Sequence, residues 1–142
     1  LFLALYSNTS ADNPAGLAPN STQTLTGSLA PGASLLFRNS SAALPAYATG
    51  TASAVCQFNG DDLVILTTAT GTGAWASRID VVGDGSTWGE NNSFCRAPGI
   101  LQPNAAWTPA EWIPKTVAQV DGAAAGTTER LGVHLFTAAL VR

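Results

Sequence analysis

The chain has 142 residues, long enough for one domain with a buried core, and a formal net charge of −3. Hydrophobic residues make up 46% of it, which excludes a disordered tail, and charged residues make up only 11%. The charge-poor surface of hydroxyl and amide groups predicts an extracellular or cell-surface location, and the scattered basic residues argue against direct binding to nucleic acid.

Short apolar runs joined by Gly-, Asn- and Pro-rich loops predict an all-β domain. The turn Asn59–Asp62 leads into a run apolar enough for a central strand, and Trp75–Val82 is its expected hairpin partner. We expect Pro98–Pro114 to be irregular apart from one helical turn that starts at Thr108. The expected strands are Leu1–Ser7, Gln23–Leu29, Ser34–Arg38, Val55–Phe58, Leu63–Thr67, Trp75–Val82, Ser93–Arg96 and Leu131–Val141.

The ends of the chain carry no targeting or anchoring signal that the sequence makes recognisable. No apolar run approaches the roughly 20 residues that cross a membrane as a helix. The apolar start, Leu1–Tyr6, is too short for the core of a signal peptide, and no basic residue precedes it. The chain also contains no Met, so we interpret it as a mature or excised piece of a protein.

Two cysteines, Cys56 and Cys95, are present. In an oxidising compartment we expect them to form a disulfide, which the loop-closure model values at about 4 kcal/mol. The alternative is two buried free thiols. A zinc site would need more Cys or His ligands than the chain has, so we expect no metal and no cofactor.

The residues needed for catalysis are missing from the sequence. His134 is the only histidine, lies in a predicted apolar strand and has no motif partner, so we interpret it as structural. No spacing among the nine acids predicts two carboxylates across a cleft. Asp61, Asp62, Asp80 and Asp84 flank one predicted hairpin, where turn capping is the plainer interpretation and a calcium ion the alternative. We expect no catalytic residue and no enzyme.

Aromatic and asparagine side chains leave two further roles open. Four tryptophans could stack on sugars, although packing at the core or its rim is the plainer interpretation; they are Trp75, Trp88, Trp107 and Trp112. Four N-glycosylation sequons lie in or beside predicted loops, and chance matches are expected in a chain so rich in Ser, Thr and Asn. Their asparagines are Asn8, Asn20, Asn39 and Asn91.

Five segments, taken in order, match blocks of one known family. Phe58–Leu66 contains Phe-Asn-Gly-Asp-Asp before aliphatic residues, and Ile79–Gly89 contains Ile-Asp-Val and Trp-Gly. Ser93–Gly99 carries an arginine in a predicted strand, Asn104–Trp112 contains Pro-x-Glu-Trp, and Leu131–His134 reads Leu-Gly-x-His. Together these segments resemble the lamin-tail domain family in its bacterial extracellular branch.

The resemblance implies an immunoglobulin-like β-sandwich that acts as a non-catalytic module, often attached to secreted nucleases, phosphatases or surface anchors. On this basis we expect residues 1–142 to form a single such domain that lacks the first N-terminal strand or strands of the family. A sandwich without that strand has an exposed edge. The C-terminal run of this chain, or a strand from a neighbouring copy, could cover the edge.

Three functions follow from these observations. The leading hypothesis is a structural or adhesive surface module that is joined to itself or to neighbouring domains through sheet edges and chain ends; in a sharper form, it is a fibre or layer subunit joined by strand exchange. The second is an accessory module of a secreted enzyme such as a nuclease, which binds carbohydrate or nucleic acid. The third is a small hydrolase that uses calcium near Asp61 and Asp62.

Overall fold

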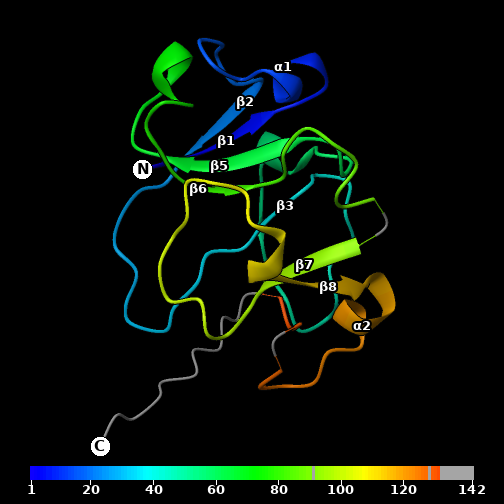
Figure 1. Ribbon diagram of the computed structural model, residues 1–142. Coiled ribbons are helices and arrows are strands. Elements are labelled where there is room, and N and C mark those ends of the chain that lie inside the picture. Colours follow the sequence, from blue (N-terminus) through cyan, green and yellow to red (C-terminus); the bar gives the residue numbers. More distant parts are fainter. Residues whose placement is uncertain (91, 128, 132–142) are drawn as a thin grey trace, which may run out of the picture.

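The computed structural model describes residues 1–90, 92–127 and 129–131 as a small β-rich fold with few, short helices (Figure 1). One four-stranded antiparallel sheet has the order β2-β1-β5-β6, and β3-β4 and β7-β8 form two small sheets. The strands are β1 Phe2–Tyr6, β2 Ser21–Thr24, β3 Phe37–Arg38, β4 Thr51–Ala52, β5 Leu63–Thr67, β6 Arg78–Val82, β7 Asn92–Arg96 and β8 Trp112–Thr116. The helices are α1 Thr9–Asp12 and α2 Val117–Asp121, with one-turn 3-10 helices at Ala54–Cys56, Gly71–Gly73 and Pro109–Glu111.

The core lies on one face of the four-stranded sheet. Alternate residues of β5 are buried, because successive side chains of a strand point to opposite faces. The strand registers place Tyr6 opposite Leu63 and Val81 opposite Ile65, so their side chains share that face. The buried cluster consists of Ala4, Tyr6, Ala11, Leu63, Ile65, Ala74 and Val81, with Trp75 and Trp107 packed against it.

An aromatic cluster connects the loops after β6 to the β7-β8 sheet. Trp107 packs against three other rings, with centroid separations of 5.5 Å to Trp88, 6.4 Å to Phe94 and 5.9 Å to Trp112. Val82 of β6 lines the same groove as Trp88, Phe94 and Trp112. Trp75 and Trp107 thus pack against the core, and Trp88 and Trp112 pack against Trp107, in line with the plainer interpretation of the tryptophans.

A network of polar side chains fixes β6, β7 and the Pro109–Glu111 turn to one another. Arg96 of β7 lies 2.8 Å from the carboxylate of Asp80 on β6 and 2.7 Å from that of Glu111. Asn104 donates its side-chain amide to Glu111 at 2.9 Å and its backbone N–H to Asp80 at 3.2 Å. The guanidinium also stacks on Trp112, 4.8 Å from the ring centre. We call these four polar residues the Arg96 network.

The central part of the sequence-based strand assignment is confirmed. Strands occur within Leu1–Ser7, at Leu63–Thr67, within Trp75–Val82 and around Ser93–Arg96, and β5 pairs with β6 as expected. The helical turn after Thr108 is also present. Within the expected strands Gln23–Leu29 and Ser34–Arg38, pairing is limited to the ends, in β2 and β3.

Two assignments are wrong. Val55–Phe58 is not a strand, because Ser53 accepts a hydrogen bond from the backbone N–H of Val55 and starts a 3-10 turn there. Pro98–Pro114 is not irregular throughout, because β8 begins at Trp112. Pro114 is tolerated in β8 because, among the described residues, that strand pairs with β7 alone and its second edge carries no further strand.

The described residues contain no helix that is both long and apolar enough to cross a membrane. The expected strand Leu131–Val141 falls, apart from its first residue, outside the described residues. His134 and Asn91 also lie outside them.

Candidate functional site

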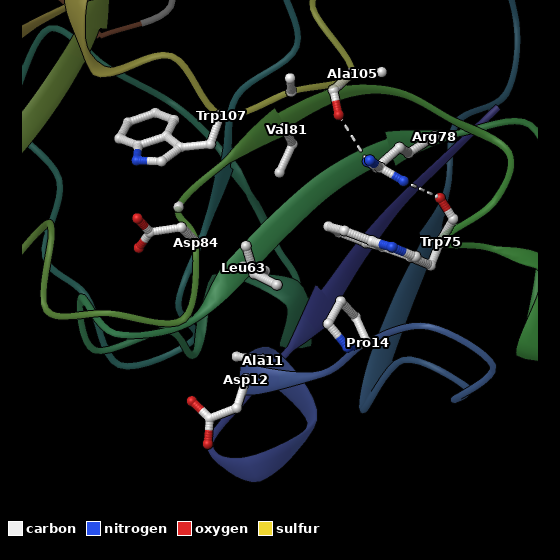
Figure 2. Close-up of a pocket in the computed structure, with 12 residues that line it drawn as sticks. Ala11, Asp12, Pro14, Leu63, Trp75, Arg78, Val81, Asp84, Ala105 and Trp107 are labelled. Atoms are coloured by element: carbon white, nitrogen blue, oxygen red, sulfur yellow. Dashed lines mark hydrogen bonds between the residues drawn. The ribbon is translucent and has the colours of Figure 1, made fainter.

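A pocket of about 290 Å³ opens over the core face of the four-stranded sheet, between two tryptophans (Figure 2). Its floor comes from β5 and β6, and its walls from α1, the turn before β6 and two loops after it. We call it the Trp75–Trp107 pocket. The lining residues are Ala11, Asp12, Pro14, Leu63, Trp75, Arg78, Val81, Gly83, Asp84, Ala105, Ala106 and Trp107.

One wall is a stack built on Trp75. The guanidinium of Arg78 lies 3.8 Å from the centre of the Trp75 ring, and Figure 2 shows Pro14 on the opposite side of the indole. Arg78 donates from Nε to the carbonyl of Ala105 at 2.7 Å and from Nη1 to the carbonyl of Trp75 at 2.8 Å. These bonds fix the guanidinium, and no hydrogen bond among the described residues uses its second amino group, Nη2.

Tyr6 supports this wall from the core. Its ring meets Trp75 edge to face, with 6.0 Å between centroids and an interplanar angle of 81°. Burial raises the pKa of the Tyr6 phenol, against the opposing effects of a hydrogen bond to the Trp75 backbone and the charge of Arg78. The phenol is therefore neutral at physiological pH and serves as a packing group.

The opposite wall carries Trp107 and Asp84, which lie side by side in Figure 2. Trp107 is held in place by its contacts with Trp88, Phe94 and Trp112 in the aromatic cluster. One carboxylate oxygen of Asp84, Oδ1, accepts from the backbone N–H and the hydroxyl of Ser86, at 2.9 and 2.5 Å. This turn fixes the direction of the carboxylate and leaves Oδ2 as an acceptor.

Asp12 completes the rim at the end of α1, where its side chain is exposed. The pocket thus combines an apolar floor with two acidic residues at its rim, Asp12 and Asp84, and the guanidinium of Arg78 on one wall. The described lining residues include no Ser, Thr, Cys, His, Lys or Tyr. The arrangement is that of a binding pocket, in which a few polar groups orient a ligand over an apolar surface.

Asp62, one of the acids singled out from the sequence, lies away from this pocket and is 2% exposed. Its carboxylate accepts from the backbone N–H groups of Asn8 at 3.0 Å and Asn59 at 3.2 Å. Its backbone carbonyl accepts from the indole of Trp88 at 2.8 Å. These are the contacts of a turn cap. Asp80 lies elsewhere, in the Arg96 network, and within the described ranges no group of three His, Cys, Asp or Glu side chains is placed to hold a metal ion.

The two cysteines are free, half-buried thiols in the structure, and no bond joins them. Cys56 lies in the Ala54–Cys56 turn and Cys95 in β7. Burial raises the pKa of both thiols; at Cys95 the charge of Lys115 opposes this effect and that of Glu129 adds to it. The expected disulfide is thus not formed here, and its formation in an oxidising compartment stays a prediction.

Two of the sequon asparagines take part in local hydrogen bonds. Asn20 accepts from the backbone N–H of Ser7 at 2.8 Å. Asn39 donates to the carbonyl of Cys56 at 3.3 Å. Asn8 is exposed and has a positive φ of 53°. Glycosylation at these positions stays a prediction.

Sequence reasoning found Trp75 and Trp107 as candidate sugar-stacking residues but did not single them out from the other two tryptophans. It missed Arg78, Asp12 and Ala106 altogether. A signal for Arg78 was present, because an arginine three residues after a tryptophan can fold back on the ring across a turn. Nothing in the sequence indicated that the loop carrying Ala105 and Trp107 returns to β6.

No family model, no curated protein and no solved structure matches the chain. The resemblance to lamin-tail domains therefore stays a prediction, and the case for function depends on the geometry of the pocket.

Proposed function

We propose that this chain is a non-catalytic module of the extracellular space or cell surface that works by adhesion, with its ligand held in the Trp75–Trp107 pocket. The observation that carries the proposal is the pocket itself. It has an apolar floor, two tryptophan walls, a fixed guanidinium and two rim carboxylates. Such a combination orients and retains a ligand.

The surroundings of the two rim acids favour binding over catalysis. Both Asp12 and Asp84 are exposed, whereas a carboxyl group that acts as a general acid at neutral pH has to be held out of water. Asp84 is also held by Ser86, as an acceptor in a turn. In the described part of the pocket, no base is hydrogen-bonded to a nucleophile, which is the arrangement that covalent catalysis needs.

We propose further that the fold is an immunoglobulin-like sandwich of the lamin-tail type. Support comes from the segments that carry the resemblance. Asp80, Arg96 and Glu111 belong to three of these segments and meet in one ion network. Asp62 and Trp88 belong to the first two and share a hydrogen bond. The shared motifs are therefore explained by mutual structural contacts, which is consistent with a module that has no chemistry of its own.

Self-association through the four-stranded sheet would have one open route within the described residues. β1 pairs on both sides with strands of its own chain, so it is not an edge. The outer side of β6 is approached by the loop that bonds Arg78 and Asp80. This leaves β2, a four-residue strand of Ser, Thr and Gln, as the edge that a second copy would extend. Assembly into a fibre or layer stays a prediction.

An adsorption isotherm tests the adhesive function. The purified chain is mixed with insoluble peptidoglycan, cellulose, chitin and collagen, and the fraction lost from solution is measured against total protein. We expect saturable adsorption to at least one of these materials and no release of soluble fragments, because the pocket binds without reacting. Serum albumin at equal concentration controls for non-specific loss. Adsorption to none of the four, or release of soluble fragments, contradicts the proposal.

A further inference from the structure

We propose that the ligand of the Trp75–Trp107 pocket is a neutral sugar ring of a polysaccharide. This inference rests on the proposed adhesive function and names the class of molecule that the pocket takes. A sugar ring has an apolar C–H face and hydroxyl groups around its edge. The pocket has a related pattern, with an apolar floor, the Trp107 ring on one wall, the Trp75 stack on the other, and acidic residues at the rim (Figure 2).

The size of the pocket suits one ring. Pockets that enclose drug-sized molecules measure roughly 300–1,000 Å³, and this pocket, at about 290 Å³, is just smaller than that range. Its mouth is open at the rim formed by Asp12 and Ala106, both of which are exposed. A chain of sugars can therefore place one unit inside while its neighbours continue along the surface.

The charged residues of the pocket lining, two acids and one arginine, disfavour an anionic ligand. An anionic ligand, including a nucleic-acid phosphate, meets the carboxylates of Asp12 and Asp84, and the only cation of the lining is Arg78. A neutral hydroxylated ring is compatible with both, since each hydroxyl can donate to a carboxylate or accept from the guanidinium.

The polar groups are also fixed before any ligand arrives. Arg78 is bound to the carbonyls of Trp75 and Ala105, and Asp84 is bound to Ser86. Trp107 is held by the aromatic cluster. Binding therefore costs little side-chain entropy, which matters for sugars because each of their hydroxyl groups must first give up water.

Affinity electrophoresis with a pocket-filling variant tests the inference. The probes are hydroxyethyl cellulose, xylan, glycol chitin, mannan and laminarin, each cast into a native gel. We expect at least one of them to retard the chain. In Ala106→Trp, the new ring occupies the pocket from an exposed position, so affinity for that probe should fall about tenfold or more, equivalent to about 1.4 kcal/mol.

Ala110→Trp is the matched control. Ala110 is also exposed, lies in the 3-10 turn that follows the loop of Ala106 and does not line the pocket, so this variant should bind like the original chain. Circular dichroism of both variants checks that the fold is kept, and Asp84→Ala offers a second way to weaken binding if Ala106→Trp does not fold.

The outcomes separate the inference from the adhesive function. A chain that adsorbs to collagen but is retarded by no polysaccharide contradicts the sugar and leaves the adhesion standing. Retardation that Ala106→Trp leaves unchanged, in a folded protein, places the sugar elsewhere and overturns the assignment of this pocket. A chain that binds none of these materials contradicts both proposals.

Discussion

Replacement of Gly83 by alanine is expected to abolish or nearly abolish folding. Gly83 has a φ of 93°, a conformation that costs a residue with a side chain about 1–2 kcal/mol. A Cβ atom there would also overlap the carbonyl oxygen of Asp62 and the indole nitrogen of Trp88, which are joined by a hydrogen bond. We expect a total cost above about 4 kcal/mol, measured by urea unfolding followed through tryptophan fluorescence or seen as loss of soluble protein.

Gly16→Ala provides the control for the backbone term alone. Gly16 also has a positive φ, 77°, but no atom lies within 4 Å of the Cβ position. This variant should lose only about 1 kcal/mol and remain folded. If Gly83→Ala and Gly16→Ala lowered the free energy of unfolding by the same amount, the result would contradict the close packing of Gly83 against Asp62 and Trp88.

The second large effect is expected at Arg96, whose side chain is only 12% exposed. Arg96→Ala leaves the carboxylates of Asp80 and Glu111 without their shared cation and removes the guanidinium from the Trp112 ring. Loss of one partner from a fully buried pair costs about 3–5 kcal/mol. Since Asp80 and Glu111 are 26% and 20% exposed, solvent screening should reduce the cost to about 2–3 kcal/mol in urea unfolding.

Arg38→Ala is the comparison for this variant. Arg38 donates only to carbonyls of its own loop, those of Asn39, Ser40 and Ala42, and no ion pair of the described residues includes it. Its loss should cost less than about 1 kcal/mol. Arg96→Lys should recover part of the stability, because it keeps the charge but not the forked geometry. Equal losses at Arg96 and Arg38 would show that the Arg96 network does not hold the sheets together.

The strands that sequence reasoning located correctly are those whose pattern reflects local physics. Leu63–Thr67 alternates between buried and half-buried residues, and the turn before it contains Gly60 at a φ of 101°. The Val55–Phe58 assignment failed because one hydroxyl, that of Ser53, outweighed a weak β propensity. Pro114 concealed β8, since whether a proline is tolerated depends on which edge of the strand is free, and a sequence does not show that.

The pocket was less accessible to prediction than the strands. Trp75 and Trp107 are far apart in the sequence and line one pocket because Asn104 bonds to Asp80 and Ala105 accepts from Arg78, which brings the loop back to β6. Both contacts are long-range and depend on single hydrogen bonds. Tryptophan content alone indicated that sugar stacking was possible, whereas the choice of the two rings required the tertiary structure.

The central claim is that the Trp75–Trp107 pocket holds a sugar, and a titration of ¹⁵N-labelled chain followed by NMR tests it most directly. The chain has four tryptophans and hence four indole N–H signals. With cellohexaose, xylohexaose, chitohexaose, mannohexaose or laminarihexaose as the probe, the largest saturable shifts should fall on Trp75 and Trp107. The signal of Trp88, whose indole N–H is bonded to Asp62, should stay in place. Absence of shifts with all five sugars, or shifts centred on Trp88 and Trp112, would contradict it.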